Sequence, residues 1–151
     1  MRPLYETAED RSKERQIIDM VAQRTGMKAV KLPKFDVDFV LMKGEIVWGV
    51  AEVKGRMKHY PQMFVGLEKI QKLRQYACTG LQARMIFATP EGIFAKKIGP
   101  AEIDGWIGVG GRKDRGDSLD IELLCYFDTS APSEEKNVMT RVCDSDPRWF
   151  Q

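Results

Sequence analysis

The sequence predicts one α/β domain in which helices flank a mixed β-sheet. Apolar residues recur at helical spacing in two segments, one between Thr7 and Gly26 and one over residues 64–80. Short runs rich in β-branched and aromatic residues lie between and after these segments, as is typical of strands. The order α-β-β-α-β, with further β structure after it, favours a mixed sheet covered by helices. A chain of 151 residues suits one domain, which we expect over residues 1–128, with residues 129–151 as a loosely ordered C-terminal tail.

The first helix is expected to begin after Thr7 and to end near Gly26. Thr7 is a typical N-cap residue, and the acidic residues of the first turn suit the positive end of the helix dipole. Gly26 can adopt the left-handed conformation in which many helices end. Glu14 lies about one turn before the apolar pair Ile17 and Ile18, so it falls at the edge of the apolar face. A carboxylate in that position is unusual for a residue that only faces solvent.

Two strands joined by a tight turn follow, over residues 37–42 and 46–54. Both are largely apolar runs, and the dipeptide Lys43-Gly44 between them is typical of a hairpin turn. Strands joined by so short a turn pair in antiparallel fashion. We therefore expect a hairpin whose second strand belongs to the core.

The second helix is expected over residues 64–80 and ends near Gly80. Its apolar side chains share one face and are those of Phe64, Leu67, Ile70, Leu73 and Ala77. Residues 99–116 are rich in glycine and are expected to form a loop. Residues 29–33 are expected to be a short strand or an extended lead-in, and the remaining apolar runs are expected to be short strands, at residues 83–90, 92–98 and 118–128.

The second strand of the hairpin carries two charges, Glu52 and Lys54, within an otherwise apolar run. Residues two apart share a face of a strand, so both side chains point to the same side. Burying an unpaired charge in a core strand lowers the free energy of unfolding by roughly several kcal/mol. A solvated edge strand or a salt bridge on one face is the structural explanation of this pair, and a reactive site is the functional one.

Two aspartates at the start of the first strand can meet this charged face. Asp36 and Asp38 share a face, and the hairpin can bring one of them close to Glu52. Two carboxylates a few Å apart repel each other unless a cation lies between them. Oxygen ligands of this kind favour a hard ion such as Mg²⁺ or Mn²⁺. Asp38 is the preferred partner because the apolar run 39–41 follows it directly, and Asp36 is the alternative.

The composition narrows the environment and the partners of the protein. Twenty-four Lys and Arg against 22 Asp and Glu give a net charge of +2, so a basic surface must come from local clusters. Three widely spaced cysteines argue against a disulfide framework and a structural zinc site. No run approaches the ~20 apolar residues of a membrane helix, and the N-terminal residues lack the pattern of a signal peptide. We expect a cytoplasmic protein with no membrane partner and no small-molecule cofactor.

The charged residues of the hairpin resemble a known nuclease motif. Asp38, followed fourteen residues later by Glu52-Val53-Lys54 in a strand–turn–strand setting, is similar to the motif of the PD-(D/E)xK superfamily. That superfamily includes many restriction endonucleases, lambda-type exonucleases and archaeal Holliday-junction resolvases. The resemblance covers roughly residues 9–90.

The likeness extends further to small phage-encoded members of the superfamily. In these, a strand similar to "EVKGR" is followed by a Tyr-Pro segment, here Tyr60-Pro61, and by a helix that carries a lysine, here Lys69. The late segment "GGRKDRGD" before a last strand is also similar. Two features depart from the superfamily pattern. Val37 stands where a proline usually precedes the aspartate, and the QxxxY motif of some exonuclease members is not matched.

The resemblance implies a restriction-endonuclease-like fold, with an α-β-β-β-α-β core and an accessory C-terminal β element. It also implies a divalent-metal-dependent nuclease that hydrolyses phosphodiester bonds in DNA. Asp38, Glu52 and the backbone carbonyl of Val53 would hold Mg²⁺ or Mn²⁺, Lys54 would position the attacking water, and Glu14 would support the metal shell. The residues expected to contact the nucleic-acid backbone are Lys69, Lys72, Arg112, Lys113 and Arg115.

Several alternatives stay open on the sequence alone. A catalytically inactive nucleic-acid-binding module of the same fold, or a phage protein-interaction or assembly factor, would share these elements. Within the nuclease class, an exonuclease, a nicking endonuclease and a junction resolvase are all compatible with the motif, as are DNA and RNA. A resolvase would need a symmetric homodimer to cut two strands. If the chain is encoded by a phage, it would act in the host cytoplasm.

Overall fold

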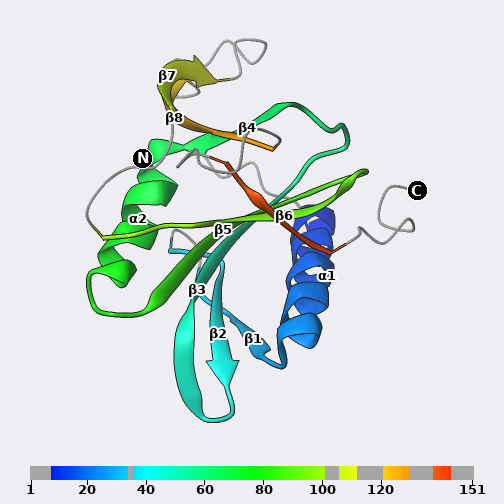
Figure 1. Ribbon diagram of the computed structural model, residues 1–151, viewed down its shortest axis with the longest axis vertical. Helices are drawn as coiled ribbons and strands as arrows, with labels where there is room; N and C mark the ends of the chain where they lie inside the picture. Colours follow the sequence, from blue (N-terminus) through cyan, green and yellow to red (C-terminus); the bar gives the residue numbers. More distant parts are fainter. Residues whose placement is uncertain (1–7, 34–35, 101–105, 112–120, 130–137, 144–151) are drawn as a thin grey trace.

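The computed structural model describes residues 8–33, 36–100, 106–111, 121–129 and 138–143. Within them, six strands form a mixed sheet in the order β1 (Lys28–Lys31), β2 (Phe39–Lys43), β3 (Ile46–Gly55), β5 (Gln82–Thr89), β6 (Gly92–Lys97) and β9 (Thr140–Cys143). Helix α1 (Ala8–Thr25) covers one face of this sheet, and helix α2 (Leu67–Ala77) covers the other (Figure 1). The predicted class, an α/β domain with a mixed sheet between helices, is confirmed.

Each face of the main sheet has its own apolar core because strand residues alternate between the two faces. On β3, Ala51 and Val53 pack on the side of α1, which contributes Ile17 and Ile18. Val50 packs on the side of α2, whose buried residues are Ile70, Leu73 and Ala77. Fully burying one such aliphatic side chain stabilises the fold by roughly 1.5–3 kcal/mol. Strand β3 is therefore buried from both sides, and its position is fixed by both helices.

Helix α1 ends as its sequence predicts. Gly26 follows the last helical residue with a φ of 71°. The N–H of Met27 donates to the carbonyl oxygen of Ala22 at 2.8 Å, which is the outer hydrogen bond of a Schellman C-cap. Thr7, the expected N-cap, lies outside the described residues. Neither of the described helices is long and apolar enough to span a membrane.

The predicted hairpin is formed by β2 and β3, and its register positions the charged residues. Phe39, the first residue of β2, pairs with Ala51. Asp38 directly precedes Phe39, so it comes to lie opposite Glu52, the residue after Ala51. A one-residue slip of this register would turn every side chain of β2 to the other face. The pairing of β2 with β3 thus decides which carboxylates meet.

The turn of this hairpin lies one residue later than the sequence indicated. Lys43 still pairs with Ile46, so the two residues of the turn are Gly44 and Glu45. Gly44 has a φ of 63°, in the left-handed region that a glycine adopts without strain. The expectation was wrong by one position because pairing continues to the end of the strand.

The expected helix over residues 64–80 is wrong at its start, since α2 begins only at Leu67. The preceding residues form a strand of a second, antiparallel sheet, whose order is β4 (Gln62–Gly66), β8 (Ile121–Asp128) and β7 (Trp106–Gly111). Phe64 pairs with Tyr126, a residue far along the chain, so the local helical pattern could not reveal this strand. Part of the expected loop at residues 99–116 is likewise a strand, β7.

The segment expected to be a loosely ordered tail contributes an edge strand to the main sheet. Residues Thr140–Cys143 form β9, which pairs with β6 in antiparallel fashion. Met139, directly before this strand, is buried at 4% exposure, and its N–H donates to the carbonyl oxygen of Asp128. This stretch therefore differs from the expectation. The segments 130–137 and 144–151 lie outside the described residues.

The parallel contact between β3 and β5 leaves no space for a side chain at Gly49. A Cβ built there would lie 2.3 Å from the backbone oxygen of Gln82. We expect Gly49→Ala to lower the free energy of unfolding by about 1–3 kcal/mol, because backbone cannot move aside as a flexible side chain can. Urea denaturation measures this change. Gly99→Ala is the control, since a Cβ there would meet no described atom within 4 Å beyond its chain neighbours. Equal stability of the two variants would contradict the close approach.

Candidate active site

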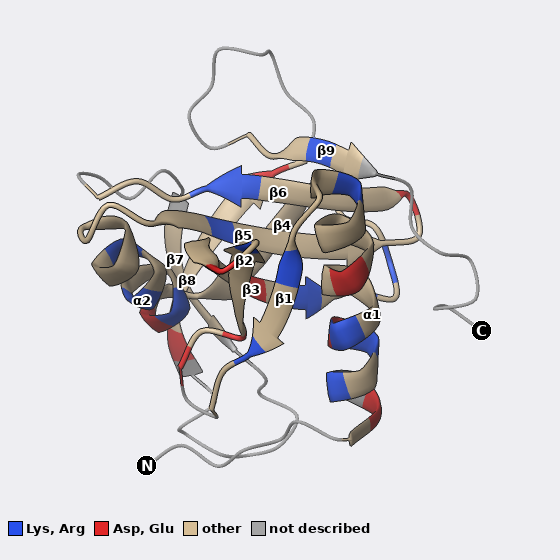
Figure 2. Ribbon diagram, turned by 90° about the horizontal axis from the view of Figure 1, so that it is seen from below, with Lys and Arg blue, Asp and Glu red and all other residues tan. Residues whose placement is uncertain are grey.

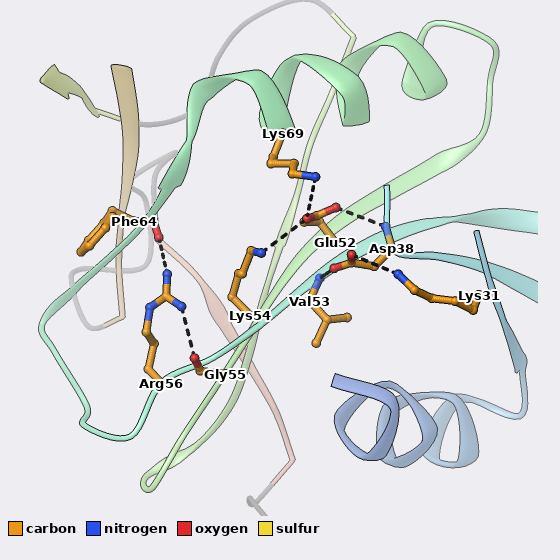
Figure 3. Close-up of polar contacts among 9 residues, drawn as sticks. All are labelled: Lys31, Asp38, Glu52, Val53, Lys54, Gly55, Arg56, Phe64 and Lys69. Atoms are coloured by element: carbon orange, nitrogen blue, oxygen red, sulfur yellow. Dashed lines mark hydrogen bonds and ion pairs between the residues drawn. The ribbon is translucent and has the colours of Figure 1, made fainter. Parts of the chain in front are cut away.

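Glu52 is the centre of the charged cluster, and it is fully buried within β3, at 0% exposure. Its side chain lies on the face of the sheet that α2 covers, together with that of Val50. The backbone N–H of Asp38 donates to Glu52 Oε2, with an N···O distance of 3.2 Å (Figure 3). A buried carboxylate without such a partner would be strongly unfavourable, so this hydrogen bond fixes the carboxylate against the start of β2.

A second hydrogen bond runs in the opposite direction, from the backbone of β3 to the side chain of Asp38. The backbone N–H of Val53 donates to Asp38 Oδ2 at 2.8 Å, and the Asp38 side chain is nearly buried. Lys31 Nζ, on β1, lies 3.4 Å from Asp38 Oδ1. Each acidic residue is thus bound by the backbone of the strand that carries the other. The two carboxylates are held side by side by the hairpin itself.

Two lysines from different elements converge on the remaining oxygen of Glu52. Lys54 Nζ, on the same strand and face, lies 3.9 Å from Glu52 Oε1, and Lys69 Nζ, on α2, lies 3.6 Å from the same atom (Figure 3). Glu52 Oε1 accepts no hydrogen bond from the described residues. Both ammonium groups are partly exposed, with side chains at 30% and 26%. The cluster therefore opens to solvent on the side of these lysines.

The proton affinity of Glu52 reflects this environment. Burial, together with the like charge of Asp38, raises the pKa of Glu52 to about 7. Lys54 and Lys69 act in the opposite direction. Repulsion between two carboxylates is the condition that a bound cation would relieve. A perturbed carboxyl group beside charged partners is also frequent at reactive sites.

Asp36, the alternative partner of Glu52, is engaged elsewhere. The hydroxyl of Tyr76, on α2, lies 3.0 and 3.1 Å from the two carboxylate oxygens of Asp36. The N–H of Val37 donates to the same carboxylate at 2.7 Å. The structure therefore brings Asp38 to Glu52, whereas Asp36 ties the segment before β2 to the second helix.

Glu14 is buried on α1, the helix that covers the face of the sheet opposite to α2. Burial lowers the pKa of Arg56, and the negative charge of Glu14 acts against this shift. Arg56 itself donates to the carbonyl oxygen of Phe64 at 3.2 Å, so it links the end of β3 to the second sheet. A role of Glu14 in a metal shell stays a prediction.

The other residues expected to contact nucleic acid occupy different settings. Lys69 is part of the carboxylate cluster, as described above. Lys72 is exposed on α2, one turn further along the helix. Those that follow β7 lie outside the described residues, namely Arg112, Lys113 and Arg115.

Two cations of this region were missed at the sequence level. Lys31 was read only as part of a short extended segment, because its contact with Asp38 depends on the pairing of β1 with β2. Arg56 directly follows the charged strand, and its adjacency to the motif was the only available signal. Its contacts with Phe64 and Phe87 arise from tertiary packing, with the guanidinium 5.6 and 5.8 Å from the two ring centroids.

The donor set at this cluster fits a hard divalent cation. Among the described residues, no group of three or more His, Cys, Asp or Glu is arranged to hold a metal. Two carboxylates, those of Asp38 and Glu52, are nevertheless adjacent. The N–H and C=O groups of one strand residue point to the same side of the strand. Because the N–H of Val53 donates to Asp38, the carbonyl of Val53 faces the side of Asp38 as well. Carboxylate and carbonyl oxygens, completed by water, are the ligands that Mg²⁺ and Mn²⁺ prefer.

The fold and this cluster define a class, an α/β protein in which a hairpin of the central sheet carries two paired carboxylates and a lysine. A family model described as "Phage putative PDDEXK endonuclease" matches residues 1–134 of the chain. The protein therefore belongs to this family of phage nucleases, and the resemblance noted in the sequence is confirmed.

Comparison with solved structures found a likeness to Hjc, a Holliday junction resolvase from the archaeal hyperthermophile Archaeoglobus fulgidus. The TM-score is 0.46 at 18% sequence identity, and the match covers 56% of this chain and 75% of the resolvase chain. A search of curated proteins gave no significant match. The family assignment rests on the family model alone.

The raised pKa of Glu52 predicts how the stability of the metal-free protein depends on pH. A carboxyl group that binds its proton more tightly in the folded state contributes stability below its unfolded pKa, here 4.5, and loses it as the pH rises through about 7. The loss attributable to Glu52 amounts to at most about 3 kcal/mol. We expect urea denaturation without divalent cations to show a steeper fall in stability between these pH values for the parent than for Glu52→Gln. Equal pH dependence of the two proteins would contradict the raised pKa.

Proposed function

We propose that the protein is a divalent-metal-dependent nuclease that hydrolyses phosphodiester bonds in DNA. One observation carries the proposal, namely the pair of buried carboxylates, Asp38 and Glu52, clasped across the hairpin with Lys54 beside them. Membership of a family of phage endonucleases supports a nuclease, and the cluster supplies the groups that such a reaction needs.

The metal that we propose is Mg²⁺ or Mn²⁺, held by Asp38, Glu52 and the backbone carbonyl of Val53. When bound, the ion lowers the pKa of water and neutralises phosphate oxygens. The register of β2 against β3, which sets Asp38 opposite Glu52, supports this assignment. Glu14 is proposed to support this shell from the side of α1.

The reaction that this site supports is the attack of a water oxygen on the phosphorus atom, with cleavage of one phosphorus–oxygen bond. Lys54 donates hydrogen bonds that orient the water, and its charge offsets negative charge that develops on the phosphate. Lys69 adds a second ammonium within reach of the same carboxylate oxygen. The residues proposed to bind the flanking nucleic-acid backbone are Lys72, Arg112, Lys113 and Arg115.

The substrate and setting follow from the family. DNA in the cytoplasm of a bacterial host is the substrate that a phage endonuclease meets, and we propose it for this chain. One cluster of this kind serves one cut, so a coordinated cut in both strands would require a symmetric homodimer. A panel of linear, nicked, single-stranded, flap and four-way DNA distinguishes exonuclease, nicking endonuclease and resolvase action.

Neutral replacement of the three central residues tests the proposed function. Glu52→Gln, Asp38→Asn and Lys54→Ala should each lower the rate of DNA cleavage in Mg²⁺ or Mn²⁺ by about a hundredfold or more, since each removes a charge next to the reacting phosphate. Cleavage of labelled DNA, followed by gel electrophoresis, measures these rates. Urea denaturation confirms that each variant is folded.

Two variants serve as matched controls for this experiment. Lys58→Ala removes an exposed lysine close in sequence to Lys54, and Asp36→Asn neutralises the aspartate that contacts Tyr76. Both should cleave within a few-fold of the parent rate. Cleavage by Glu52→Gln or Lys54→Ala at the rate of the parent would contradict the proposal. A parent protein that binds DNA but never cleaves it would show an inactive binding module instead.

A further inference from the structure

Two cations lie over the ring of Phe39, the first residue of β2 and the neighbour of Asp38. Lys31 Nζ lies 5.1 Å from the ring centroid, and Arg15 Cζ lies 5.7 Å from it. The ring is buried, whereas the side chains of Lys31 and Arg15 are 38% and 43% exposed. Strand β1 and helix α1 thus each bring one cation to the same ring, and both elements carry basic segments (Figure 2).

Lys31, one of these two cations, also contacts the carboxylate pair. Its Nζ lies 3.4 Å from Asp38 Oδ1, so the same ammonium is within reach of both the buried cluster and solvent (Figure 3). Arg15 pairs with a different carboxylate, that of Asp19. Its Nε contacts Asp19 at 3.2 Å, which engages one of the five N–H donors of the guanidinium and leaves the Nη groups for another acceptor.

Stabilisation of Asp38 does not account for this pair of cations. A partly exposed salt bridge contributes only about 0–1 kcal/mol, and Asp38 already accepts a hydrogen bond from Val53. Arg15 makes no contact with Asp38 that would explain its place over the same ring as Lys31. Both side chains are partly exposed, so an anion from solvent can approach them, and the positive charges of both would attract it.

We propose that Lys31 and Arg15 bind a backbone phosphate that flanks the hydrolysed one, an inference that rests on the proposed function. The bound group is a phosphodiester of the nucleic acid, which enters from the side of β1 and α1 and passes Asp38. Contacts to phosphate fix the position of the strand and carry no sequence information. The two cations therefore set where the backbone lies relative to Glu52 and Lys54, and they do so equally for all sequences.

The salt dependence of DNA binding tests this proposal. A plot of log affinity against log salt concentration has a negative slope, and each phosphate contact that is lost reduces the magnitude of this slope by about 1. We expect that effect in Lys31→Gln and in Arg15→Gln, and a slope smaller in magnitude by about 2 in the double variant. Fluorescence anisotropy with a labelled duplex in EDTA measures the affinity at each salt concentration. Lys31→Arg, which keeps the charge, should retain the parent slope.

Lys28→Gln is the matched control. Lys28 is also exposed on β1, but it lies at the other end of the strand, where it pairs with Met42 near the hairpin turn, whereas Lys31 pairs with Phe39. Its removal should leave both the affinity and the slope unchanged. A lysine that only stabilised Asp38 would affect folding or metal affinity and would not alter the salt slope.

The outcomes separate this inference from the proposed function. Unchanged slopes in Lys31→Gln and Arg15→Gln overturn the inference, even if the parent protein cleaves DNA. Slopes of smaller magnitude in these variants, together with a parent protein that never cleaves in Mg²⁺ or Mn²⁺, uphold the phosphate contacts and overturn the proposed nuclease function. A parent protein that does not bind the duplex at all overturns both.

Discussion

The contact between Asp38 and Glu52 is the interaction on which the charged cluster depends. Each carboxylate accepts a hydrogen bond from a backbone N–H next to the other, at 3.2 and 2.8 Å, so the hairpin holds two like charges together. Burial, and after it the proximity of Asp38, raises the pKa of Glu52 to about 7. The fold must keep this repelling pair in place, and the packing of β3 between two helices and against β5 provides the rigidity.

Cations reach this pair from three separate elements. Lys54 belongs to the strand of Glu52, Lys69 comes from α2, and Lys31 comes from β1 and meets Asp38. None of these contacts is local except the first, so the complete cluster exists only when the sheet and the second helix are assembled. Folding and function are thereby coupled, because loss of the helix or of the edge strand would leave buried carboxylates with fewer compensating charges.

The sequence predicted the local half of this arrangement and missed the rest for physical reasons. A period of two put Glu52 and Lys54 on one face, and a short turn allowed only a narrow choice of partner across the hairpin. The last three residues of β4 were read as the start of a helix because the partner of this strand lies in β8, far along the chain. Lys31 carried no signal for the same reason, since only the pairing of β1 with β2 brings it to Asp38.

Calorimetric titration with Mn²⁺ tests most directly whether the carboxylate pair is a metal site. The parent protein should bind the ion, and Asp38→Asn and Glu52→Gln should each lose most of that binding, because each removes one of two charged ligands. Asp36→Asn should bind as the parent does, since Asp36 is engaged with Tyr76. Binding by Asp38→Asn and Glu52→Gln that equals the parent's, or no binding by the parent, would contradict the account.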